Sequence, residues 1–227
     1  MKISVAIPTW SMNGKGSTFL DRSLKQLAKQ SHEPFEVVVT DHSVDDEICY
    51  SCKKYEDLLN IRYYRNERLR GNPAANTNTG ISMCTGDYIK LLCHDDFLYD
   101  SMSLYHINEA LEKTSAQWLV SSYVHQKDSG LPYRYHEPSL NENISTVNTI
   151  GTPSCLTIKN ADVLFFDEAL SYMYDCEYYH RMIKKFGEPH ILKRVTMVNR
   201  IHGDQTTNMV SKELAEKEEA YIHAKHS

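Results

Sequence analysis

Two adjacent carboxylates, Asp95 and Asp96, follow directly after residues 88–92, a short apolar stretch that predicts a buried strand. Hard divalent cations such as Mn²⁺ and Mg²⁺ prefer oxygen ligands, and a bound cation can absorb the charge that develops on a leaving diphosphate. The same side chains could equally cap a helix that begins after them. The pair alone therefore leaves a metal site and a helix cap equally open.

Two more groups of polar residues follow predicted strands. Asp41 and Ser43 come after the apolar residues 35–39 and could accept hydrogen bonds from a nucleobase or a ribose, although capping of the next helix is the simpler interpretation. The segment 70–80 combines Arg70 with small residues and amides, which would let the backbone approach a ligand closely. It could instead be a helix start with a proline in the first turn.

A further acidic motif lies in the second half of the chain. Asp175 and Glu177 open a predicted helix, where a carboxylate could act as a general base on a hydroxyl. Acids are also favourable in a first helical turn, and Arg181 could be only an ion-pair partner. His202 follows the last predicted strand and could ligate a metal or contact phosphate, although a lone histidine is usually structural.

The elements that must position these residues alternate between strand and helix. This order predicts βαβ crossovers and a mostly parallel sheet, in which ligands bind outside the carboxyl ends of the strands. Thr9, Asp41, Ser43, Asp95 and Asp96 should therefore gather at one edge. The predicted strands are 3–7, 35–39, 61–64, 88–92 and 118–123, and the predicted helices are 17–30, 46–59, 73–83 and 102–113.

The second half of the chain has a different pattern. Residues 125–150 are polar and predict a long irregular surface stretch, which we expect to shape an acceptor site together with the C-terminal segment. Two further strands are predicted at 154–158 and 191–198, and a helix at 174–186. Residues from 211 onward predict a charged helix that frays at its end.

The composition narrows the class of protein. Hydrophobic residues make up 41% and charged residues 24%, which is typical of a soluble globular protein. A net charge of −5 argues against a general nucleic-acid binder. No apolar run approaches the roughly 20 residues that span a bilayer, and the N-terminus lacks the apolar region of a secretory signal. We expect a cytoplasmic protein that could contact the inner face of the membrane peripherally.

Taken in order, these residues resemble the family 2 glycosyltransferases, which have the GT-A fold. The resemblance runs from Val5 to about His202. It rests on Val-Ala-Ile-Pro-Thr-Trp at 5–10, Glu-Val-Val-Val-Thr-Asp-His-Ser-Val-Asp at 36–45, Asn-Thr-Gly at 78–80, Gly-Asp-Tyr-Ile at 86–89, the acidic pair, Gly-Thr-Pro-Ser at 151–154 and Phe-Asp-Glu-Ala-Leu at 166–170. Each motif is weak alone, whereas their order and spacing together are specific.

The resemblance implies a Rossmann-like αβα sandwich in a single domain over 1–205, with a nucleotide-sugar-binding half (1–100), an acceptor-binding half (101–205) and a charged helix at 206–227. It implies inverting transfer of a sugar from a nucleotide-sugar donor, for which we expect a UDP-sugar, to a hydroxyl of a glycan or lipid-linked glycan. The implied roles are Asp175 as general base, Asp96 and His202 as ligands of Mn²⁺ or Mg²⁺, Pro8, Thr9, Asp41, Ser43, Arg70, Asn78 and Asp95 as donor-binding residues, and Glu177 and Arg181 as acceptor-binding residues.

Three positions depart from the family pattern. Thr40 stands where the family often has Asp, Cys93 stands at the first acidic position of the metal motif, with His94 next to it, and Tyr174 replaces the glutamate that precedes the base. Two other functions stay open at this point. A nucleotidyltransferase would use a similar nucleotide-binding sheet, and a non-catalytic module would bind a nucleotide sugar or a glycan without needing Asp175.

Overall fold

Four strands of the N-terminal half form the parallel part of a nine-stranded sheet. The computed structural model describes residues 1–127 and 130–227. Within it, β3, β2, β1 and β4 lie side by side in that order and run parallel. Their apolar, β-branched sequences suit strands that are covered on both faces. The bounds are β1 (Ile3–Thr9), β2 (Phe35–Asp41), β3 (Ile61–Arg65) and β4 (Tyr88–Leu91).

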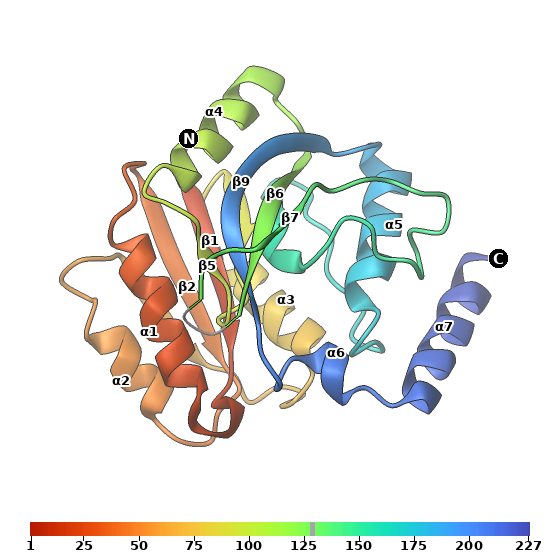
Figure 1. Ribbon diagram of the computed structural model, residues 1–227, viewed down its shortest axis with the longest axis horizontal. Coiled ribbons are helices and arrows are strands. Elements are labelled where there is room, and N and C mark those ends of the chain that lie inside the picture. The colour runs from red at the N-terminus through yellow and green to blue at the C-terminus, as the bar shows by residue number, and fades with distance from the viewer. Residues whose placement is uncertain (128–129) are drawn as a thin grey trace.

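Helices cover both faces of this sheet, which confirms the predicted αβα sandwich (Figure 1). The helices α1 (Gly16–Leu27), α2 (Glu47–Lys53) and α4 (Ser103–Thr114) pack on one face. The helices α3 (Pro73–Met83) and α5 (Tyr174–Phe186) pack on the other. The prediction of a helix over 46–59 was wrong at its C-terminal end, because turns follow Lys53.

The second half of the chain extends the sheet with mixed directions. The strand β8 (Leu156–Lys159) lies antiparallel between β4 and β6 (Trp118–Lys127), and β9 (His190–Ile201) runs parallel to β6. The short β5 (Phe97–Leu98) pairs with β9, so the residues directly after the acidic pair belong to the sheet. In Figure 1, β9 curves across the molecule from the top to the bottom. Because β9 is 12 residues long, His202, which follows its last residue, lies at the opposite end of the strand from His190.

The expectation of an irregular stretch over 125–150 was wrong at its start. The strand β6 continues to Lys127, where its residues pair with the end of β9, and β7 (Arg134–His136) pairs back onto β6. These strands were not predicted, because their side chains are polar and show no apolar pattern. Pairing between strands satisfies the backbone hydrogen-bonding groups whether or not the side chains are apolar. Residues 137–152 contain no helix or strand, as predicted, and a 3₁₀ turn at Pro153–Cys155 leads into β8.

The C-terminal residues form two helices, α6 (Thr206–Met209) and α7 (Lys212–His226). The predicted charged helix is confirmed, and it is docked on the protein. Ser211 caps its N-terminus by accepting a hydrogen bond from the Leu214 N–H, and both Glu218 and Ile222 are buried. Among the described residues, no helix is long and apolar enough to cross a membrane.

Candidate active site

The carboxyl ends of β1, β2 and β4 bring the predicted polar residues to one edge of the sheet, as expected. The Thr9 hydroxyl lies 3.4 Å from Asp41 Oδ1, which links the ends of β1 and β2. His94 follows β4 and lies close enough to Pro8 and Asp41 for both to influence its pKa, although burial is the dominant effect and lowers it. The residues of three separate sequence motifs therefore meet at this edge.

The Asp41 carboxylate is fully buried and held by the protein itself. It accepts hydrogen bonds from the Ser43 N–H at 2.8 Å and the Tyr63 hydroxyl at 2.8 Å, and it pairs with Arg65 Nε at 3.3 Å. Asp41 therefore organises the end of β2. Two polar atoms beside it, Ser43 Oγ and His94 Nε2, are buried without a hydrogen-bond partner. Unsatisfied buried polar groups are costly, so they favour a polar ligand at this edge.

Asp95 faces His202 at the end of β9. Asp95 Oδ2 lies 3.0 Å from His202 Nε2, while the Asp204 N–H donates to His202 Nδ1 at 3.2 Å, which places the ring proton on Nε2. Phe19 packs on the imidazole with a ring distance of 4.9 Å. Burial opposes ionisation of Asp95, but the hydrogen bond and charges of the neighbouring histidines bring its pKa below the ordinary value.

Asp96 occupies a different environment from its neighbour. Its side chain is almost fully buried, and Oδ1 accepts hydrogen bonds from Asn199 Nδ2 and the Arg200 N–H, both at 3.0 Å. Thr152 Oγ1 lies 3.4 Å from Oδ2. Burial, and then the charge of Asp95, raises the pKa of Asp96 to about 7. Asp96 therefore ties the loop after β4 to β9, whereas Asp95, with a side chain that is 16% exposed, is accessible to a ligand.

A divalent cation fits these residues through oxygen and imidazole donors. Ligand atoms of Cys93, Asp95 and Asp96 lie within 4.8 Å of one another. Burial raises the pKa of the Cys93 thiol, so it stays protonated and is a poor ligand for a hard cation. Asp95 offers an ionised carboxylate. His202 would offer Nε2 in place of the proton that it donates to Asp95, with the ring proton then on Nδ1 and the hydrogen bond from the Asp204 N–H broken. The donor set therefore suits Mn²⁺ or Mg²⁺ at Asp95 better than at Cys93.

Asp175 begins α5 and belongs to the same region. Its Oδ1 accepts a hydrogen bond from the Cys176 N–H and its Oδ2 from Asn148 Nδ2, both at 2.8 Å. Burial raises the pKa of Asp175 to about 6. The neighbouring Tyr174 is close enough to Asp95 and Asp175 for both charges, after burial, to raise its pKa. Asp175 therefore lies in the same region as the acidic pair, with a pKa suited to a general base near neutral pH.

Two of the predicted ligand-binding residues, Asn78 and Glu177, are engaged in contacts within the protein. The Asn78 amide donates to the Phe166 carbonyl and Glu168 Oε1, both at 2.9 Å, and accepts from the Phe166 N–H at 2.8 Å. Glu177 is fully buried and binds Arg181 Nε at 2.7 Å. These side chains hold the fold together, because no polar atom is left for a donor on Asn78 or for an acceptor on Glu177.

Arg70 and Arg181 each form an ion pair with a glutamate of the protein. Arg70 is partly exposed and lies 3.6 Å from Glu67, at the connection between β3 and α3. Arg181 donates to Glu177 and to the Phe165 carbonyl, at 2.8 Å. The simpler interpretation of Arg181 as an ion-pair partner therefore agrees with the structure, and we do not carry an acceptor role forward for Glu177 or Arg181.

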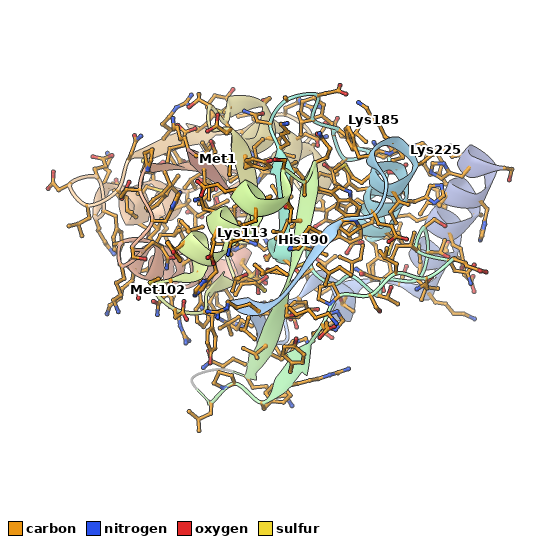
Figure 2. All side chains as sticks on the ribbon, turned by 90° about the horizontal axis from the view of Figure 1, so that it is seen from above. Met1, Met102, Lys113, Lys185, His190 and Lys225 are labelled. Carbon is orange, nitrogen blue, oxygen red and sulfur yellow. The ribbon has the colours of Figure 1, made fainter. Side chains whose placement is uncertain are left out.

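The helix α7 supports the start of α5 through two buried glutamates that are far apart in the sequence. Lys225 Nζ lies 2.8 Å from Glu177 Oε1, and Figure 2 shows Lys225 between α7 and α5. Glu218 accepts hydrogen bonds from the N–H groups of Ser171, Tyr172 and Met173, at 2.8, 3.0 and 2.8 Å. The sequence does not reveal Glu218, because nothing in a charged helix distinguishes the one acid that is buried.

Glu218→Gln is expected to lower the free energy of unfolding by about 1–3 kcal/mol, because the new amide N–H groups would face backbone N–H donors. The shift of the loop before Asp175 should also reduce turnover. Urea unfolding measures the first effect and steady-state kinetics the second. Glu219→Gln is the matched control, because Glu219 is exposed and its contact is a long one on the same helix, with 3.7 Å between its Oε1 and His223 Nε2. Equal stability of the two variants would remove the supporting role of Glu218.

The mixed sheet and its acidic carboxyl edge define a GT-A-type α/β protein. The chain belongs to glycosyl transferase family 2, whose family model matches residues 4–185. An uncharacterized glycosyltransferase of Rickettsia prowazekii is 23% identical over 96% of this chain and 70% of its own length. The poly(ribitol-phosphate) beta-N-acetylglucosaminyltransferase TarP of Staphylococcus aureus is 30% identical over 44% of this chain and 30% of its own.

Solved structures agree with the fold. The crystal structure of Staphylococcus aureus TarS in complex with UDP-GlcNAc matches with a TM-score of 0.70 at 17% identity, covering 98% of this chain and 66% of that one. The mannosyltransferase PcManGT from Pyrobaculum calidifontis, in complex with GDP-Man and Mn²⁺, matches with a TM-score of 0.62 at 13% identity, covering 87% and 56%. At these identities the likeness establishes the fold, and the chain spans only part of both proteins.

Proposed function

We propose that the protein is an inverting glycosyltransferase that moves a sugar from a UDP-sugar to a hydroxyl of a glycan or lipid-linked glycan. The observation that carries the proposal is the contact of Asp95 with His202 at the carboxyl edge of the sheet, with the half-buried Asp175 beside Tyr174 in the same region. A single displacement at an anomeric carbon needs ligands for a cation that stabilises the leaving diphosphate, and a separate base that takes the proton of the acceptor hydroxyl.

Asp95 and His202 would hold Mn²⁺ or Mg²⁺, whose charge would stabilise the leaving diphosphate when bound. This exchanges the roles expected for the acidic pair, since Asp96 is committed to Asn199 and Arg200 and would act by positioning the loop. The unpartnered Ser43 Oγ and His94 Nε2 are suited to hydrogen bonds with the nucleotide, with Pro8, Thr9 and Asp41 forming the wall behind it. UDP-GlcNAc and Mn²⁺ in the two similar structures support this choice of ligands.

Asp175 would remove the proton from the acceptor hydroxyl as that oxygen attacks the sugar. Asn148 and the Cys176 N–H fix the carboxylate in place, and burial keeps its pKa close to neutrality. The resulting nucleophile would displace the nucleoside diphosphate in one step, with inversion. A cytoplasmic location, contact with the inner face of the membrane and the identity of the acceptor stay predictions.

A donor screen tests the proposed function. Thermal unfolding is measured with UDP-, GDP-, CMP- and dTDP-sugars, each with and without Mn²⁺. A ligand that binds the folded state stabilises it by mass action, by about 2.7 kcal/mol at a concentration 100 times its Kd. We expect a UDP-sugar to raise the unfolding temperature only with Mn²⁺. No stabilisation by any donor would contradict the proposal.

The pH dependence of kcat/KM should report the ionisation of Asp175. Because burial raises its pKa to about 6, the base is protonated and inactive below this value, so kcat/KM should rise through about pH 6 and level off above it. Asn148→Ala removes a hydrogen bond that favours the ionised form, and should move the midpoint to higher pH. A midpoint unchanged by Asn148→Ala would separate the titration from Asp175.

A further inference from the structure

A basic pocket of about 600 Å³ lies between α1 and the end of β9. Arg22, Lys25 and Lys29 line it from α1, and Arg200 and His202 line it from β9. Asp21 is the one acid among its lining residues, and its carboxylate already accepts a hydrogen bond from the Tyr55 hydroxyl at 3.2 Å. A larger hollow of about 730 Å³, near Met1 and Lys159, lies away from the acidic pair and carries no comparable charge pattern.

Arg200 is the residue that distinguishes this pocket from an ordinary basic surface. The residue is only 5% exposed, and its Nε and Nη2 atoms are buried without a hydrogen-bond partner among residues 1–127 and 130–227. In the described part of the chain, no carboxylate oxygen lies within the 4.0 Å of an ion pair with it. The central carbon of the guanidinium lies over two aromatic rings, 4.3 Å from the centre of the Phe19 ring and 5.5 Å from the centre of the Phe97 ring. Among the described residues the guanidinium therefore has no ion-pair partner, although the charges of Asp95 and Asp96 are near enough to attract it.

A second cation, Arg22, lies near Arg200, and the two positive charges together favour a bound anion. The Arg22 guanidinium lies 4.0 Å from the centre of the Phe97 ring, so that two arginines share one aromatic side chain. An arginine side chain keeps its proton at neutral pH, so the protein holds a buried positive charge beside another. Buried charges are normally paired, and cation–π contacts offset only part of the cost.

We propose that this pocket binds a phosphate group at a site separate from the donor diphosphate. Planar guanidinium groups match the geometry of phosphate oxygens, and four cations around one cavity favour a strongly charged anion. Among the residues assigned to the donor and the metal, only His202 also lines the pocket; Thr9, Asp41, Ser43 and Asp95 do not. The phosphate could be inorganic phosphate or a phosphate ester carried by a larger substrate. The proposal concerns binding and does not depend on sugar transfer.

Calorimetric titrations of the full chain with inorganic phosphate and with glycerol phosphate, at constant ionic strength, test the proposal. Both are repeated with the chain saturated with UDP and Mg²⁺. We expect at least one of the two probes to bind and to keep its affinity when UDP is present. Binding of both would point to the phosphate group itself, and binding of glycerol phosphate alone to an ester. No binding of either probe, or displacement by UDP, would overturn a separate site.

Variants locate the site. Arg22→Gln removes a half-buried cation from the pocket and is expected to weaken phosphate binding by about tenfold, which corresponds to one charge-assisted hydrogen bond. Arg200→Gln should weaken it at least as much, and Arg22→Gln keeps the test valid if that variant fails to fold. Lys54→Gln, which removes an exposed cation that follows the C-terminus of α2 and does not line the pocket, is the control for net charge and should leave the affinity unchanged. Equal affinities of the Arg22→Gln and Lys54→Gln variants would place the phosphate elsewhere.

Discussion

Asp175→Asn is expected to lower kcat by about 10²–10⁴, because a positioned general base contributes a factor of this size. The asparagine keeps the shape of the side chain, and its Oδ1 can still accept the hydrogen bond from the Cys176 N–H, so the start of α5 should stay intact although the bond to Asn148 is lost. Donor affinity should change little, because the hydrogen bonds of Asp175 go to Asn148 and the Cys176 N–H and not to Asp95 or His202. Radiolabelled sugar transfer measures the first quantity and calorimetry with a UDP-sugar the second.

Asp162→Asn is a suitable control for the loss of one carboxylate, since Asp162 is exposed and pairs only with Lys185 at 2.9 Å. It should transfer sugar at the rate of the unmodified protein. Full turnover by Asp175→Asn would remove this residue from the mechanism. A loss of donor binding equal to the loss of turnover would instead make Asp175 a binding residue.

Asp95→Asn is expected to abolish the Mn²⁺ dependence of donor binding while leaving the fold stable. The carboxylate is partly exposed, and the Oδ1 of the asparagine can still accept the hydrogen bond from His202, so the substitution takes away a charged metal ligand without leaving His202 unpartnered. Asp96→Asn should behave in the opposite way. Its carboxylate accepts hydrogen bonds from Asn199 and the Arg200 N–H, and the new amide would disturb them at a cost of about 1–3 kcal/mol of stability.

Calorimetric titration of the UDP-sugar with and without Mn²⁺, together with urea unfolding, separates these two variants. The expected pattern is loss of metal-dependent affinity in Asp95→Asn and loss of stability in Asp96→Asn. The reverse pattern would return the metal to Asp96, as the sequence resemblance implied. Unchanged Mn²⁺-dependent affinity in both variants would remove the acidic pair from the metal site.

The parallel half of the fold was predictable because local and long-range preferences agree there. Apolar strands such as residues 35–39 end in polar residues, and the helices between them have clear apolar periods, so the alternation determines both the sheet and its ligand edge. The antiparallel insertion of β8 and the pairing of β7 were not predictable. Their backbone partners are distant in sequence, and the polar side chains of residues 125–136 resemble those of a loop.

The site could be located from the sequence, but its division of labour could not. Asp95 and Asp96 are chemically identical neighbours, and only their contacts with His202 and Asn199, more than 100 residues later, separate the partly exposed carboxylate from the buried one. The sequence likewise does not show that Glu177 and Glu218 are buried. Whether an acid in a helix faces solvent or a buried partner depends on packing, and sequence patterns record that packing only weakly.

Pulsed electron paramagnetic resonance of Mn²⁺ bound to the protein with UDP tests the central claim most directly, because it detects the nuclei bonded to the metal. If Asp95 and His202 hold the cation that binds the donor, the spectrum will show a ¹⁴N coupling from a histidine together with ³¹P couplings from the diphosphate. The ¹⁴N coupling will vanish in His202→Gln. A spectrum with ³¹P couplings but no ¹⁴N coupling in the unmodified protein would contradict the assignment of His202 as a metal ligand.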